Sequence, residues 1–144
     1  MISKIKSGMI NDKKAIFTIV AKNYIGLAKV LESSLTANSD NASFYIFVAD
    51  EFDENHFLGS NTLVSRYVLD YPDSVWKEMS FKYDLTEFCT SIKPACFQHL
   101  FSLGFSKVLY MDPDIYVYSS LSFVFEILDN HSIKEQEILN GIGN

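Results

Sequence analysis

Two acidic residues that follow an apolar run are the residues of this sequence best suited to chemistry. Asp112 and Asp114 stand on either side of Pro113, directly after the run VLYM of residues 108–111. Side chains two residues apart in extended backbone point the same way, so both carboxylates can address one cation. Carboxylate oxygens suit hard ions such as Mn²⁺ and Mg²⁺, which keep open positions for substrate phosphates. The pattern predicts a Mn²⁺ or Mg²⁺ site at Asp112 and Asp114, with an ordinary acidic turn as the alternative.

The two cysteines do not suggest a disulfide. Cys89 and Cys96 lie seven residues apart in a segment with helical patterning. Two turns of helix place them on one face but about 10 Å apart, which is too far for a disulfide bridge. We therefore expect two free, small and buried side chains.

Three apolar runs, at residues 16–20, 44–48 and 108–111, carry the strand signal. Each run is continuous and rich in β-branched or aromatic residues, which is typical of strands covered on both faces. Helical patterns lie between them, so the first two runs form a βαβ unit with parallel strands. The sequence predicts an α/β fold with a mainly parallel sheet and helices on both faces. Residues 63–69 are a candidate for a further strand.

The helices are predicted from caps and apolar stripes. Asn23 is the expected N-cap of the first helix, whose buried stripe is Leu27, Val30, Leu31 and Leu35. Asp84 followed by Glu87 has the form of a capping box that opens a later helix.

Two further positions set the expected helix boundaries. Pro94 suits the first turn of a new helix better than a helix interior, and Gly104 is expected to end that helix. Ser120 is expected to cap a last amphipathic helix that carries Phe125 and Leu128.

Composition restricts the class of partner. The chain has 144 residues, is 48% hydrophobic and carries a net charge of -6. That charge argues against nucleic acid, because phosphate backbones are bound by basic surfaces. No stretch approaches the ~20 apolar residues of a membrane helix, so we expect no transmembrane segment and a cytoplasmic protein, with peripheral association at the inner membrane face as an alternative.

Three stretches together resemble the GT-A glycosyltransferases, and the lipopolysaccharide galactosyltransferase and glycogenin-like members in particular. KVLYMDPDIYVYSSL, residues 107–121, resembles the DxD region of that family. Residues 17–35, FTIVAKNYIGLAKVLESSL, resemble its first strand and helix, and residues 81–100, FKYDLTEFCTSIKPACFQHL, the helical region before the DxD strand. The resemblance covers residues 14–133, and it implies a metal-dependent enzyme that transfers a sugar from a nucleotide-sugar donor to a glycan, lipid or protein acceptor.

The resemblance also implies roles for individual residues. Asp112 and Asp114 would bind the metal and the donor diphosphate, and Lys93 would face the diphosphate or the sugar. The residues that would line the base and ribose end of the site are Ala21, Lys22, Asn23, Tyr24 and Asp50. Each has a simpler reading as a cap, a loop charge or an exposed side chain. No catalytic base or nucleophile is identified, which leaves retention or inversion open.

The chain is shorter than the family pattern. We expect an N-terminal extension at residues 1–13, the GT-A-type domain at 14–133 and an irregular or truncated tail at 134–144, so that the acceptor half is missing and turnover is in question. The alternative is a truncated, non-catalytic donor-binding remnant or an interaction module. A haloacid-dehalogenase type phosphatase is disfavoured, because that pattern needs Thr or Val where this chain has Tyr116.

Overall fold

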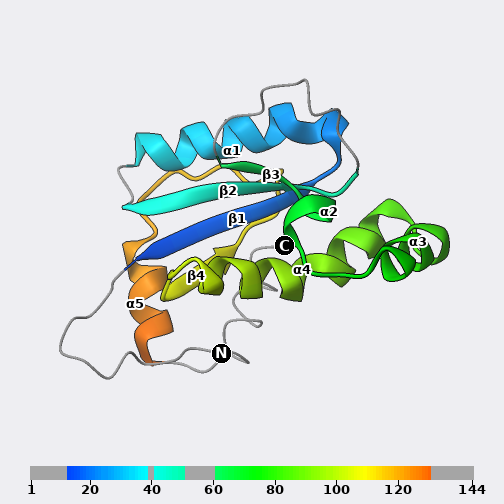
Figure 1. The fold of residues 1–144 in the computed structure, drawn as a ribbon. Coiled ribbons are helices and arrows are strands. Elements are labelled where there is room, and N and C mark those ends of the chain that lie inside the picture. Colours follow the sequence, from blue (N-terminus) through cyan, green and yellow to red (C-terminus); the bar gives the residue numbers. More distant parts are fainter. Residues whose placement is uncertain (1–12, 39–40, 51–60, 131–144) are drawn as a thin grey trace.

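The computed structural model describes residues 13–38, 41–50 and 61–130, and it contains a four-stranded sheet in which every pairing is parallel (Figure 1). The strands are β1 Lys14–Val20, β2 Ala42–Val48, β3 Thr62–Val64 and β4 Lys107–Tyr110, in the order β3-β2-β1-β4. This confirms the predicted α/β class with a parallel sheet. The order 3-2-1-4 is consistent with a Rossmann-like, doubly wound sheet.

Helices cover both faces of the sheet, which explains why its strands are continuously apolar. Helices α1 (Ile25–Ala37) and α5 (Ser122–Asn130) pack on one face, where β1 contributes Ile16 and Val20. Helices α3 (Asp73–Lys82) and α4 (Leu85–Ser102) pack on the other face, where β1 contributes Phe17. Alternate residues of one buried strand therefore supply two separate cores.

The first helix differs from the prediction in its start and in its buried stripe. Asn23 lies inside a short 3-10 turn, η1 (Lys22–Tyr24). The N-cap of α1 is Tyr24, so the prediction of Asn23 as the N-cap was wrong. Leu27 and Val30 are 40% and 51% exposed, whereas the buried residues are Ala28, Leu31, Ser34 and Leu35. The buried stripe keeps a helical period but starts one residue later, at a small side chain that lets the helix lie close to the sheet.

The predicted strand at residues 63–69 is mostly wrong. Strand β3 ends at Val64, and helix α2 (Ser65–Val68) follows at once. The register explains this, since Val64 pairs with Val48, the last residue of β2. Beyond that pair β2 offers no further backbone partner, so the chain turns into a helix.

Helix α4 begins with the predicted capping box. The Asp84 carboxylate accepts a hydrogen bond from the Glu87 N–H at 2.8 Å, and the Glu87 carboxylate accepts one from the Asp84 N–H at 3.2 Å. The new helix expected at Pro94 was wrong, because α4 runs through it as one helix of 18 residues. Gly104, with φ of 97°, follows the end of the helix as predicted.

Burial explains why α4 is not broken. Its buried residues are Phe88, Ile92, Cys96 and Leu100, which repeat every four residues on both sides of the proline. Pro94 itself is exposed, so the proline ring does not interrupt this stripe. Tertiary packing therefore outweighs the local preference of proline to end a helix. Among the described helices, none combines the length and apolarity that crossing a bilayer requires.

Candidate functional site

The candidate site lies where the strand order reverses, between the carboxyl ends of β1 and β4. In open parallel sheets, ligands bind in the crevice outside this point. Strand β4 ends opposite Phe17, three residues before β1 ends at Val20. The Met111 N–H donates to the Phe17 carbonyl at 3.0 Å, and Asp112 comes next along the chain. Asp112 therefore follows the end of β4 at the point where open parallel sheets commonly bind ligands.

The exits of β1 and β2 are joined by hydrogen bonds. The Ala49 N–H donates to the Val20 carbonyl at 2.8 Å. The Lys22 N–H donates to the Asp50 carboxylate at 2.7 Å, which occupies one carboxylate oxygen. Asp50 thus lies beside the segment 21–24, as the resemblance implied. Within that segment Ala21 is buried, whereas Lys22, Asn23 and Tyr24 are exposed.

The acidic pair occupies a turn, which corrects one step of the sequence argument. The Ile115 N–H donates to the Asp112 carbonyl at 3.2 Å, and Pro113 and Asp114 form the centre of the turn. Proline suits this first central position because its φ is already fixed. The backbone between the two acids is not extended, so a strand's alternation does not align their side chains. Asp112 is half-buried and Asp114 is exposed, and neither forms an ion pair with any residue that the structure describes.

Lys93 contacts Tyr110, the last residue of the strand that precedes the acidic turn. Its ammonium lies 3.8 Å from the centre of the Tyr110 ring, a cation–π contact between α4 and β4. The Asp112 carboxylate lies within electrostatic reach of the Tyr110 hydroxyl. Burial, followed by the charge of Asp112, raises the pKa of Tyr110 well above its usual value.

Tyr110 was missed as a site residue, although a signal for it was present. It stands two residues before Asp112, at the end of a strand, and side chains at that spacing share a face of the sheet. Lys93 belongs to α4, and the Tyr110 side chain packs in the core on the α4 side of the sheet. The pairing of Lys93 with Tyr110 could not be read from the sequence, because it depends on how α4 crosses β4.

The cysteines are free, as predicted, with Cys96 buried and Cys89 half-buried. Burial, followed by the charge of Asp50, raises the pKa of Cys89 to about 11. The charge of Lys93 acts on Cys89 in the opposite direction. Cys89 therefore lies within electrostatic reach of both Asp50, which follows β2, and Lys93 of α4.

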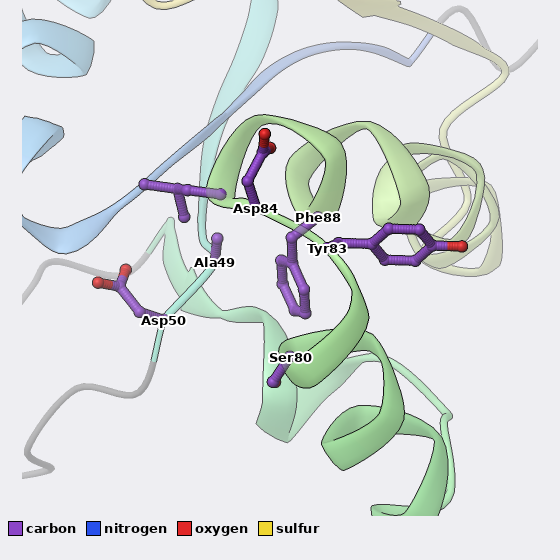
Figure 2. A pocket seen from close by; sticks show the side chains of 7 residues that line it. Ala49, Asp50, Ser80, Tyr83, Asp84 and Phe88 are labelled. Carbon is purple, nitrogen blue, oxygen red and sulfur yellow. The ribbon is translucent and has the colours of Figure 1, made fainter.

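A pocket of about 220 Å³ lies between the end of β2 and the helices α3 and α4 (Figure 2). Figure 2 shows the Phe88 ring directed into this space and the Tyr83 ring directed away from it. The lining residues are Ala49, Asp50, Ser80, Tyr83, Asp84, Leu85 and Phe88. Asp50 is the one predicted site residue among them. Ligand pockets commonly measure about 300–1,000 Å³, so this pocket is smaller than a typical ligand site.

The side chains that could ligate a metal at this site are the carboxylates of Asp112 and Asp114. In the described ranges, no group of three or more His, Cys, Asp or Glu side chains is placed to hold a metal. Mg²⁺ and Mn²⁺ are commonly held by one or two carboxylates together with substrate phosphates, so Asp112 and Asp114 fit such an ion by their chemistry.

Comparison of the chain with protein-family models, with curated proteins and with solved structures gives no match. Function therefore has to be argued from the chemistry of the site. That chemistry consists of an acidic turn, a lysine that contacts the last residue of the preceding strand, and an aspartate that follows the end of β2.

Proposed function

We propose that this chain carries the nucleotide-sugar site of a GT-A-type, metal-dependent glycosyltransferase. One observation carries the proposal. Asp112 follows β4 at the point where the strand order reverses, has no ion-pair partner among the described residues, and comes two residues after Tyr110, whose ring contacts the Lys93 ammonium at 3.8 Å. An anionic turn next to a lysine is suited to a ligand that brings both a cation and a diphosphate.

Each residue then has a distinct task. Asp112 and Asp114 would hold Mn²⁺ or Mg²⁺, which when bound supplies the positive charge that stabilises a departing diphosphate. Lys93 would add a second positive charge beside that diphosphate. Asp50 has one carboxylate oxygen occupied by the Lys22 N–H and one left to accept a hydrogen bond from a sugar hydroxyl.

The partners follow from the same chemistry. The donor is a nucleoside diphosphate sugar, and the acceptor is a glycan, a lipid or a protein. Because nucleotide sugars of this kind are supplied in the cytoplasm, we place the reaction there. The chain's negative net charge favours a small donor that arrives with its metal over a nucleic acid.

Metal-dependent donor binding tests the proposal. Thermal shift and calorimetry with a panel of nucleoside diphosphate sugars should show binding in the presence of Mn²⁺ and much weaker binding without it. A donor at 100 times its Kd stabilises the folded state by about 2.7 kcal/mol, which a melting curve detects readily. Asp112→Asn and Asp114→Asn should each lower donor affinity at least tenfold. Asp70→Asn, which removes an exposed carboxylate outside the site, should leave it unchanged.

Two results would separate the alternatives. Donor binding that ignores both Mn²⁺ and the two Asn variants would remove the metal-dependent reading. Metal-dependent binding without release of the donor sugar, in the presence of candidate acceptors, would favour a non-catalytic donor-binding module.

A further inference from the structure

Two tyrosines lie exposed and in contact in the segment that follows the acidic turn. Tyr116 is 51% exposed and Tyr118 is 86% exposed, and their ring centres lie 4.8 Å apart. The two ring planes are tilted by 50°, so neither ring fully covers a face of the other. The two rings together form one bent aromatic surface, hereafter the tyrosine platform.

The backbone beneath the tyrosine platform is fixed to the core. Burial alternates along residues 115–118, and Val117 is buried between the two exposed tyrosines. The Val117 N–H donates to the Ser34 hydroxyl of α1, and the Val117 carbonyl accepts from the amide of Asn38, the C-cap of α1. A surface whose backbone is already fixed loses less conformational entropy when a ligand binds to it.

The area of the tyrosine platform suits a small ligand. Single exposed apolar side chains are common, but adjoining aromatic rings form a patch that is available for binding. Since full burial of a tyrosine covers about 150–250 Å², the two exposed fractions leave roughly 200–350 Å² for a ligand. Each partner of a standard protein interface contributes ~800 Å². The platform therefore fits one or two sugar rings better than a folded protein.

The charge around the platform favours a neutral ligand. Residues 108–130 contain four acidic residues, Asp112, Asp114, Glu126 and Asp129, and no lysine or arginine. Nucleic acids and anionic lipids bind where basic side chains gather, so this segment disfavours both. A sugar ring is neutral, and it presents C–H groups on its faces and hydroxyls at its edge. The C–H groups can pack on a tyrosine ring while the hydroxyls stay hydrated or bond to the phenol oxygens.

We propose that Tyr116 and Tyr118 form a glycan-binding subsite that stacks a sugar ring of the acceptor. The assignment of this glycan as the acceptor rests on the proposed function, because the platform begins two residues after Asp114. The inference narrows the acceptor from a glycan, a lipid or a protein to a neutral glycan. Affinity comes from the aromatic faces, so substitutions that keep or remove the rings test it.

Binding of neutral oligosaccharides to the full chain tests the inference. Maltotetraose, cellotetraose and β-1,4-galactotetraose are titrated in EDTA without any donor, and saturation-transfer NMR follows the contacts between aromatic and sugar protons. At least one oligosaccharide should bind to the wild type. Tyr116→Ala and Tyr118→Ala should each weaken this binding about five- to tenfold, because each removes one stacking face. Tyr116→Phe and Tyr118→Phe keep the faces and should retain most of the affinity.

Tyr67→Ala is the matched control. Tyr67 is 58% exposed and belongs to α2, outside the tyrosine platform. Oligosaccharide affinity in this variant should equal that of the wild type. An equal loss in Tyr67→Ala would assign the effect to the removal of any surface tyrosine and overturn the inference. Failure of all three oligosaccharides to bind to the wild type would overturn it as well.

The outcomes separate this inference from the proposed function. Wild-type protein that binds a nucleotide sugar with Mn²⁺ but no oligosaccharide contradicts the inference alone. Wild-type protein that binds an oligosaccharide through both tyrosines but no nucleotide sugar contradicts the proposed function and leaves the glycan site in place. Salt-sensitive binding of oligolysine that both alanine variants abolish, without oligosaccharide binding, would assign the platform to a basic protein partner and overturn the inference.

Discussion

Ser34 should be a structural link between α1 and the segment that follows the acidic turn. Its hydroxyl accepts a hydrogen bond from the Val117 N–H at 3.0 Å and donates one to the Leu31 carbonyl at 2.8 Å. Ser34 is 1% exposed and Val117 is 5% exposed, so water cannot replace the serine. Asn38 completes the link, since its amide donates to the Val117 carbonyl at 2.9 Å. Residues 115–118 begin directly after Asp114, so this link helps to set where the turn lies.

Ser34→Ala leaves the Val117 N–H buried without an acceptor. An unsatisfied buried donor costs about 1–3 kcal/mol, whereas the lost bond to Leu31 costs little because that carbonyl remains within the helix ladder. For a chain of this size, a change of that order corresponds to a fall in Tm of roughly 3 to 10 °C. The free energy of unfolding, measured by urea denaturation, should fall by the same 1–3 kcal/mol while the m-value stays constant.

Ser33→Ala provides the matched control on the adjacent position. Ser33 is exposed, and its hydroxyl donates to the Lys29 carbonyl of its own helix at 3.0 Å. Both substitutions gain the same helix propensity, about 0.5 kcal/mol, so their difference isolates the link to Val117. Equal stability of Ser34→Ala and Ser33→Ala would refute the reasoning. In a double-mutant cycle, Ser34→Ala and Asn38→Ala should couple by about 0.5 kcal/mol or more, because both hold the same residue.

Two further predictions concern α4. Asp84→Ala removes the acceptor of the capping box and should lower the free energy of unfolding by about 1 kcal/mol; an unchanged urea midpoint would show that the helix start is stabilised by other contacts. At pH 9, alkylation of Cys89 should be roughly 50-fold slower than that of a thiol with an ordinary pKa, because the pKa is raised to about 11 and the thiolate is the reactive form. The rate should rise about tenfold per pH unit up to that pKa, and fast labelling at pH 8, read by mass spectrometry of single-cysteine variants, would contradict the burial argument.

The raised pKa of Cys89 also has a consequence for stability. The folded state keeps the thiol protonated at a pH where the unfolded chain has lost the proton. This contribution to stability is complete below the ordinary thiol pKa and is lost as the pH rises toward about 11. Stability should therefore decline through this alkaline window, and Cys89→Ser should reduce the decline.

The sheet was predictable because its strands are buried on both faces. Continuous apolar runs at residues 16–20, 44–48 and 108–111 lie within or across β1, β2 and β4, since no other placement buries so many consecutive side chains. The run at 63–69 was ambiguous, because a short apolar run has no period of its own. There, the length of β2 decided where β3 ends.

The helices show the same division between local and tertiary effects. The capping box at Asp84 depends on residues three apart in the chain, so it could be read directly. The position of Pro94 inside a helix could not be predicted in this way, because the continuity of α4 depends on its buried stripe, which packs against β1 and β4. The buried stripe of α1 followed a helical period, but the rotation of the helix depended on how closely Ala28 approaches the sheet.

The sequence by itself determined the class of fold and the strand that precedes Asp112, because apolar burial and short-range capping are encoded by neighbouring residues, whereas the pairing of that strand with β1 came from the tertiary structure. Only the tertiary structure decided that Lys93 contacts the Tyr110 ring and that Ser34 holds the segment after the acidic turn. The Lys93–Tyr110 contact joins residues 17 positions apart, and the Ser34–Val117 hydrogen bond joins residues 83 positions apart. Their geometry follows from helix crossing and strand register, which no local pattern specifies.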